Sequence, residues 1–282
     1  MKPKIIFFGS DKYSVLVLNQ LVGDKQFKVA SIVTHTSPCP VEDYAQTLFE
    51  MKYTTTKKFD KNFLKKMRQL KPDIGVLASF GKILPKEILE IPKHSILNIH
   101  PSLLPKYRGP TPVPTAILNG DQETGVTIIK MDEKVDHGPI VAQFKEEIKP
   151  DETADALLER LFEAGAGVLK TLLPSYLEGQ IELRKQDDAK ATYTKLFTRE
   201  DGKIDWQKPG DYLKRFIRAM DPWPGAWTEV KLQGKDKKRL KILKAHLEKG
   251  KLVLDQVQLE GKNPVIWKQF QEGYPGVKIR NN

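Results

Sequence analysis

The stretch Ile74-Gly-Val-Leu-Ala-Ser-Phe80 is an unbroken apolar run, which is typical of a parallel strand buried on both faces of a sheet. A second run, Ile5–Phe8, leads through Gly9-Ser10 into apolar residues at helical spacing, so it predicts a strand that turns into a helix. Between these runs we expect one strand and then two helices, over residues 29–33, 41–51 and 59–70. The alternation predicts an α/β fold with a Rossmann-like, doubly wound and mostly parallel sheet.

The Gly9-Ser10 turn invites comparison with a dinucleotide site, but the G-x-G-x-x-G spacing is absent because only one glycine stands there. The turn is therefore interpreted as part of the fold and not as a cofactor fingerprint. The N-terminus of the helix behind it can still hold an anionic or polar group, since its first backbone N–H groups have no partner within the helix.

The second half of this domain begins with a short strand at residues 96–100. A proline-dense stretch at 101–114 follows, and we expect an ordered loop without regular structure there. The pattern then predicts two further strands and a long helix, at residues 126–131, 140–144 and 151–177. Together these segments form a predicted domain over residues 1–180.

Charge is distributed unevenly along the 282 residues, whose net charge is +11. The net is +6 for residues 1–150, −3 for 151–200 and +8 for 201–282. The last segment alternates short strand-like runs with glycine turns, which predicts a small basic β-barrel of the OB-like kind. Its charge favours nucleic acid as a partner, although on composition alone a merely basic surface is an equal alternative. We expect a linker at 181–200 and this C-terminal domain at 201–282.

Cysteine content and hydropathy restrict the compartment and the chemistry. The single cysteine, Cys39, excludes an internal disulfide and a cysteine-based zinc cage. The first apolar run is too short for a signal peptide, and no stretch reaches the ~18 apolar residues of a membrane span. The histidines lack the spacing of a zinc site. We therefore expect a cytoplasmic, metal-free protein without membrane contact.

Three polar side chains suit acyl transfer without a covalent enzyme intermediate. Asn98 and His100 stand two apart at the end of a predicted strand, so they point to the face where an open α/β sheet binds ligands. An amide and an imidazole N–H can stabilise the negative charge that forms when an amine attacks a carbonyl. Asp136, in a turn, can orient the imidazole and assist proton transfer. The alternative is that Asn98 and His100 only cap the strand and anchor the loop.

Two stretches resemble the folate-dependent formyltransferase superfamily. They read Asn98-Ile-His-Pro-Ser-Leu-Leu-Pro-Lys-Tyr-Arg-Gly109 and Met131-Asp-Glu-Lys-Val-Asp-His-Gly138, with Asn119-Gly-Asp-Gln-Glu-Thr-Gly-Val-Thr127 between them. The resemblance implies that Asn98, His100 and Asp136 are the catalytic trio and that 10-formyltetrahydrofolate is the co-substrate. The folate contacts that it implies are Phe80, Gly81, Ile83, Ser102, Leu103, Leu104 and Pro105.

Further along the chain, Lys203-Ile-Asp-Trp206 and Arg218-Ala-Met-Asp-Pro-Trp-Pro-Gly-Ala-Trp227 resemble the C-terminal domain of methionyl-tRNA formyltransferases. This resemblance implies that the acceptor is the amino group of a charged initiator tRNA, and we expect a monomer. A basic domain can neutralise tRNA phosphates, which agrees with the assignment. The expected tRNA contacts are Lys106, Arg108, Lys190, Lys195, Lys237, Lys238 and Arg239.

Two other functions stay open. The segment Thr36–Val41 is short where that family carries a long basic loop, which favours a sugar-nucleotide amine formyltransferase of the same superfamily as an alternative. A non-catalytic RNA-binding protein on this fold is the third hypothesis, because the C-terminal segment is basic.

Overall fold

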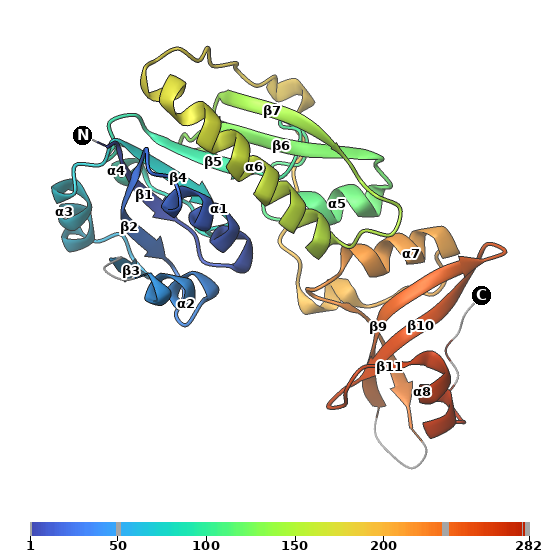
Figure 1. Ribbon diagram of the computed structural model, residues 1–282. Helices are drawn as coiled ribbons and strands as arrows, with labels where there is room; N and C mark the ends of the chain where they lie inside the picture. The colour runs from blue at the N-terminus through green and yellow to red at the C-terminus, as the bar shows by residue number, and fades with distance from the viewer. Residues whose placement is uncertain (1, 49–51, 233–236, 278, 280–282) are drawn as a thin grey trace. The chain divides into compact units, whose positions relative to one another are not determined.

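The computed structural model describes residues 2–48, 52–232, 237–277 and 279. Contacts divide the chain into two compact units. The first comprises Met1–Pro112, Glu123–Glu147 and Leu158–Thr194; the second comprises Val113–Gln122, Ile148–Leu157 and Lys195–Asn282. Each unit has its own sheet and is described by itself (Figure 1).

The first unit is built on a seven-stranded sheet in the order β3-β2-β1-β4-β5-β6-β7. Its strands are β1 (Lys4–Phe8), β2 (Lys28–Thr34), β3 (Tyr53–Thr55), β4 (Ile74–Ala78), β5 (Ile96–His100), β6 (Glu123–Lys130) and β7 (Ile140–Glu147). The first five strands pair in parallel, whereas β6 pairs antiparallel with both β5 and β7. The predicted Rossmann-like fold class is confirmed, with β6 and β7 as an addition at one edge.

Helices cover both faces of this sheet (Figure 1). They are α1 (Lys12–Val22), α2 (Pro40–Thr47), α3 (Lys61–Gln69), the short α4 (Lys86–Leu89) and the long α6 (Ala154–Leu177). On one face, Phe63 and Met67 of α3 pack with Ile6 and Phe8 of β1 in a buried cluster. On the other, α1 and α6 lie against each other, where the rings of Tyr13 and Phe162 stack.

The direction of strand progression reverses between β1 and β4, because the chain first builds outward to β3 and then returns to the other side of β1. Ligands of open α/β sheets bind outside the carboxyl ends of strands near such a reversal. The carboxyl ends of β1, β4 and β5 are Phe8, Ala78 and His100. The turns after these residues are therefore where a site is expected.

The second unit contains an antiparallel four-stranded sheet in the order β11-β10-β9-β8, as expected for the strand-rich C-terminal segment. Its strands are β8 (Ala226–Lys231), β9 (Lys237–Glu248), β10 (Lys251–Leu259) and β11 (Val265–Ile266). Buried Leu240, Ile242 and Val257 form the apolar side of the sheet. Helices α7 (Gly210–Ala219) and α8 (Trp267–Gly273) complete this part.

Three element predictions need correction. The predicted helix 41–51 occupies Pro40–Thr47, and its predicted last residues, 49–51, lie outside the described part. The proline-dense stretch ends in a helix, α5 (Pro112–Asn119), because proline fits the first turn of a helix, where no N–H is needed. The strand β3 and the helix α7 were missed.

Among the described residues, no helix is long and apolar enough to cross a membrane.

Two glycines of α6 provide a test of how this helix packs on the sheet. A Cβ atom at Gly165 would lie 2.8 Å from Cγ2 of Ile99 and 3.0 Å from Cγ1 of Val126, whereas a Cβ at Gly167 would meet only Gln20, at 3.9 Å. We expect Gly167→Ala to raise the free energy of unfolding by up to ~1 kcal/mol through helix propensity. Gly165→Ala should lower it, because overpacking costs about 1–3 kcal/mol. Urea unfolding of both variants measures this, and equal effects would contradict the packing.

Candidate functional site

The site begins at the carboxyl end of β5, where Asn98 and His100 are almost completely buried. Their side chains share one face of the strand because residues two apart in a strand point the same way. The backbone of β5 is fixed on both sides, by β4 in parallel and by β6 antiparallel. Two polar side chains are thus held rigidly at the strand end where ligands are expected.

Asp136 lies beside both of these side chains. Its Oδ1 accepts a hydrogen bond from Nδ2 of Asn98 at 3.2 Å, and its Oδ2 lies 3.5 Å from Nδ1 of His100. Oδ2 also accepts a hydrogen bond from the backbone N–H of Gly109 at 2.8 Å. The residue adopts φ +47°, a left-handed conformation that turns the carboxylate toward the strand. Residues 38 positions apart in the sequence are therefore brought together, as the sequence predicted.

The ring of His100 is held from its other side by the protein backbone. Its Nε2 lies 2.9 Å from the carbonyl oxygen of Tyr107. A carbonyl only accepts hydrogen bonds, so Nε2 carries the hydrogen. The Nδ1 atom then faces the Asp136 carboxylate at 3.5 Å, a contact that is an ion pair only when the ring is protonated. The ring of His100 is therefore held between the Tyr107 carbonyl and the Asp136 carboxylate.

The loop after β5 is built around Thr127 of the neighbouring strand β6. The Thr127 hydroxyl donates to the carbonyl of Ser102 at 2.6 Å and accepts from the backbone N–H of Leu104 at 3.1 Å. Nε2 of Gln143, on β7, donates to the carbonyl of Leu104 at 2.8 Å. The Ser102 hydroxyl donates to the carbonyl of Lys106 at 2.7 Å. These bonds fix the proline-rich loop and with it the Tyr107 carbonyl that holds His100.

A second layer of contacts holds the Asp136 turn. Nε2 of Gln186 donates to the carbonyls of Asp136 and Gly138, both at 2.8 Å. The Gln186 side-chain oxygen accepts from the guanidinium of Arg108, at 2.8 Å from its Nη2. Arg108 also donates to Asp188 at 2.7 Å and to the Tyr193 hydroxyl at 3.2 Å. The segment predicted to be a linker thus contributes side chains that fix the candidate site.

The predicted folate contacts fall into two groups. Side chains of Phe80 and Leu104 are buried in cores, and Ser102 is fully buried with its hydroxyl bonded within the loop. These residues can offer a ligand only backbone atoms. In contrast, Ile83 is 72% exposed and Gly81 is exposed, while Leu103 and Pro105 are half-buried. The exposed residues follow β4, the strand that pairs with β5.

The predicted tRNA contacts differ in how available they are. Arg108 is corrected: it is 1% exposed and its guanidinium is engaged with Gln186, Asp188 and Tyr193, so it does not face a phosphate. Lys106 is exposed and Lys238 half-buried. The others are paired with carboxylates: Lys190 with Asp187, Lys195 with Asp201, Lys237 with Glu229 and Arg239 with Glu200. Surface pairs of this kind are weak, so these cations can exchange partners.

Polar side chains also gather where strand progression reverses. Asp11 caps α1 by accepting from the backbone N–H of Ser14 at 2.9 Å, so the helix N-terminus is satisfied within the chain and the expected place for an external anion is taken. Burial raises the pKa of the Asp11 carboxyl above its ordinary value. His35, after β2, lies 2.8 Å from the Ser10 hydroxyl, and its ring meets Phe80 edge-on. Burial, with the charge of Lys82 nearby, lowers its pKa.

Sequence reasoning missed Tyr107, Gly109, Gln186 and Thr127 as parts of the site. Tyr107 and Gly109 act through backbone atoms, for which side-chain chemistry gives no signal. Thr127 and Gln186 are ordinary polar residues, and only the fold shows what they hold. In the described part of the chain, no group of three or more His, Cys, Asp or Glu side chains is placed to bind a metal ion.

Comparison with known proteins gives the family. Residues 4–173 match the formyl transferase domain, and residues 197–252 match the formyl transferase C-terminal domain. The chain belongs to the formyl transferase family. The stretches quoted from residues 98–138 lie within the first match, and those from residues 203–227 lie within the second.

Relatives of this formyl transferase include a protein of Roseiflexus sp. (strain RS-1) named methionyl-tRNA formyltransferase. It is 44% identical over 238 residues, which are 81% of this chain and 73% of the relative. Among solved structures, a methionyl-tRNA formyltransferase from Clostridium thermocellum superposes with a TM-score of 0.63 at 20% identity, covering 91% and 98% of the two chains. An N-formyltransferase from Helicobacter canadensis, in complex with folinic acid and dTDP-3-aminofucose, superposes with a TM-score of 0.65 at 20% identity. This match covers 94% of this chain and 99% of that protein. The structures establish the shared fold.

Gln186 provides a test of how the Asp136 turn is held in this formyl transferase. Gln186→Leu removes both hydrogen bonds to the turn and leaves the Arg108 guanidinium without one acceptor. Each buried group left unpaired costs about 1–3 kcal/mol, so we expect a lower thermal midpoint and a formyl-transfer rate reduced about tenfold or more. The exposed Gln180→Leu, in the same segment, is the matched control. A stable Gln186→Leu protein with an unchanged rate would contradict this role.

Proposed function

We propose that this chain transfers a formyl group from 10-formyltetrahydrofolate to the amino group of methionyl-initiator tRNA. The observation that carries the proposal is the convergence of Asn98 and His100 on the Asp136 carboxylate at the carboxyl end of β5. The proposal takes a monomer in the cytoplasm as the working form. It assigns catalysis to a domain at residues 1–180 and tRNA binding to residues 201–282, joined by the segment 181–200.

Asn98 is the proposed donor to the oxygen of the tetrahedral intermediate. Its amide nitrogen has two hydrogens, and Asp136 accepts one of them at 3.2 Å. The bond orients the amide and leaves the second hydrogen for a ligand oxygen. Because the side chain is buried and set on a central strand, the donor is positioned before the charge forms, which is the condition for effective oxyanion stabilisation.

His100 and Asp136 are the proposed proton carriers. The attacking amine must lose a proton when its nitrogen bonds to the formyl carbon, and a base near neutral pH has to receive it. Nδ1 of His100 lies 3.5 Å from Oδ2 of Asp136, so the carboxylate can stabilise the positive charge of the imidazolium that forms when the ring takes up this proton. The Tyr107 carbonyl fixes the ring during the transfer.

The residues present fit a folate carrier at this edge of the sheet. A pterin ring needs an apolar surface, and Ile83 exposes 72% of its side chain after β4, beside the exposed Gly81. Backbone groups of the ordered loop at Ser102–Pro105 can supply the polar contacts, since the Ser102 hydroxyl is already bonded. When bound, the folate supplies the formyl carbon that the amine attacks.

The acceptor is inferred from the relatives and from the second unit. Relatives that bear the name methionyl-tRNA formyltransferase match about four-fifths of this chain at 36–44% identity. Residues 201–282 carry a net charge of +8, which suits a phosphate backbone. The second candidate acceptor is an amino sugar nucleotide, favoured by the short connection at residues 35–39 between β2 and α2.

A direct assay separates the two acceptors. Purified protein with 10-formyltetrahydrofolate is offered charged initiator tRNA and an amino sugar nucleotide side by side, and formylated product is measured. We expect transfer to the tRNA alone. Transfer to the sugar alone would remove the tRNA assignment, and transfer to neither with intact donor would remove both.

Removal of the proposed oxyanion donor should slow the reaction strongly. Asn98→Ala is expected to reduce kcat about 10²- to 10³-fold while KM for the tRNA changes little, because the interaction forms in the transition state. Asp136→Asn, which removes the carboxylate beside the His100 ring, should reduce kcat at least as much. Single-turnover rates measure both, and Asn119→Ala, outside the site, is the control. Full activity of both variants would contradict the roles assigned to Asn98 and Asp136, whereas no formyl transfer by the unaltered protein would leave the non-catalytic RNA-binding hypothesis standing.

A further inference from the structure

The C-terminal sheet has a polar face on which three strands bring side chains into register. Trp227 on β8 lies opposite Lys241 on β9, and Lys241 lies opposite Gln258 on β10. Directly opposed residues of neighbouring strands point to the same face. The buried Leu240 and Ile242 alternate with Lys241 along β9, so they belong to the other, apolar face.

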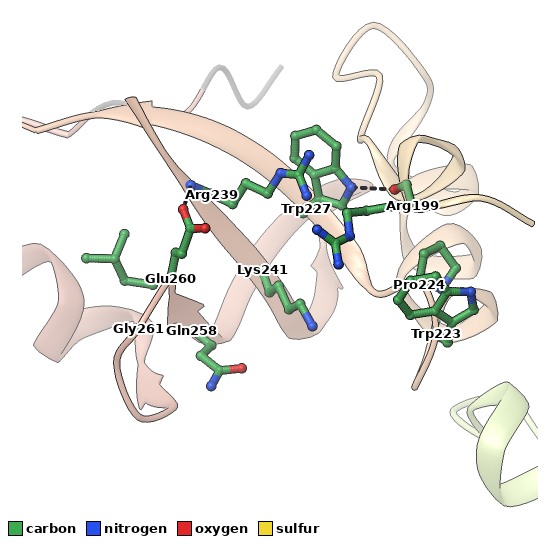
Figure 2. A pocket seen from close by; sticks show the side chains of 10 residues that line it. Arg199, Trp223, Pro224, Trp227, Arg239, Lys241, Gln258, Glu260 and Gly261 are labelled. Atoms are coloured by element: carbon green, nitrogen blue, oxygen red, sulfur yellow. Dashed lines mark hydrogen bonds between the residues drawn. The ribbon is translucent and has the colours of Figure 1, made fainter. Parts of the chain in front are cut away.

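A pocket of about 300 Å³ lies on this polar face, within the second unit (Figure 2). Trp227, which is 3% exposed, and Trp223, which is 55% exposed, both line it. Its size is at the lower end of the range for small-molecule sites, which suits a unit as large as one nucleotide. An indole with an exposed face in such a pocket is a stacking surface for a flat ring.

The cations around the pocket differ in whether they already have partners. The guanidinium of Arg239 lies over the Trp227 ring, 4.2 Å from its centroid, and donates to Glu200 at 3.0 Å. This guanidinium therefore already has a carboxylate partner. Within the described part of the chain, neither the Arg199 guanidinium nor the Lys241 ammonium forms an ion pair, and both residues are exposed. Two unpaired cations thus line one pocket.

The backbone places these two cations firmly. The Arg199 carbonyl accepts a hydrogen bond from Nε1 of Trp227 at 2.9 Å, which ties residue 199 to strand β8 (Figure 2). Lys241 is held in the middle of the sheet by pairing with both β8 and β10. The lining also includes the carboxylate of Glu260, so an anionic group in the pocket is attracted by Arg199 and Lys241 and repelled by Glu260.

We propose that this pocket binds a nucleotide, with its base stacked on Trp223 and its phosphate between Arg199 and Lys241. An exposed indole and two cations in one pocket favour a ligand that carries both a planar ring and an anion, and a nucleotide carries both. An unpaired nucleotide of an RNA and a free mononucleotide share this chemistry. The site lies outside the Asn98–His100–Asp136 centre and does not depend on which amine is formylated.

The test measures binding of three probes to the full-length protein by titration calorimetry without folate. The probes are hexa-adenylate, adenosine monophosphate and inorganic phosphate. We expect hexa-adenylate to bind, and Trp223→Ala to weaken it about 5- to 100-fold through loss of stacking. Trp223→Phe should weaken it less, because a ring remains. Lys241→Gln should weaken it and reduce the slope of log affinity against log salt by about 1.

The matched control is Lys244→Gln, which removes the same charge from the same strand at an exposed residue that does not line the pocket. It should bind like the unaltered protein, and thermal unfolding checks that every variant is folded. The Asn98→Ala variant should bind hexa-adenylate as the unaltered protein does, because Asn98 does not line the pocket. A negative result in the binding test is therefore distinct from a negative result in the formyl-transfer assay. Binding of adenosine monophosphate as tightly as hexa-adenylate would support a free nucleotide as the source, and much weaker binding would support RNA.

Three results would overturn the proposal. The first is unchanged binding of hexa-adenylate to both Trp223→Ala and Lys241→Gln. The second is an equal loss in Lys241→Gln and Lys244→Gln, which would show a diffuse attraction to the basic surface instead of a site. The third is phosphate binding as tight as that of adenosine monophosphate, since the base would then contribute nothing.

Discussion

The Asp136 carboxylate is the group on which the geometry of the site depends. Its two oxygens receive the Asn98 amide, the His100 ring and the Gly109 N–H, so one side chain joins β5, the loop after it and a distant turn. A buried carboxylate is stable only when its oxygens are paired, and here each partner is also a part of the candidate centre. Loss of the carboxylate would therefore remove the contacts that join β5, the loop after it and the Asp136 turn. The hydrogen bonds that hold the turn thus also hold the candidate site.

That support comes from a part of the chain without regular structure. Gln186 uses its amide nitrogen for two carbonyls of the Asp136 turn and its oxygen for Arg108, so all its polar atoms are bonded. A buried network of this kind rigidifies only when it is complete, because each unpaired member costs more than the bond contributes. Arg108 is in this sense a structural residue, although its position in a basic-looking loop suggested a phosphate contact.

Local patterns predicted much of the sheet, because β4 is a short, continuously apolar run that is typical of a strand buried on both faces. Asn98, His100 and Asp136 were candidates from strand periodicity and local chemistry, and the resemblance indicated that they act as one trio. The antiparallel pairing of β6 with β5 and β7, the helix that starts at Pro112 and the role of Gln186 were not predictable in this way. They are set by contacts across many residues, such as the 50 positions between Gln186 and Asp136, which leave no periodic signal.

Net charge, like the strand patterns, does not show which contacts each side chain makes. The basic excess of residues 201–282 indicated an anionic partner but not where it would bind, since charge counts ignore pairing. The structure pairs Lys237 with Glu229 and Arg239 with Glu200, so these two cations are less available to a phosphate. Arg199 and Lys241, which no pattern marked, form no such pair among the described residues, and they line one pocket with Trp223. The position of unsatisfied charge beside an exposed ring, and not the amount of charge, is what distinguishes a site from a basic surface.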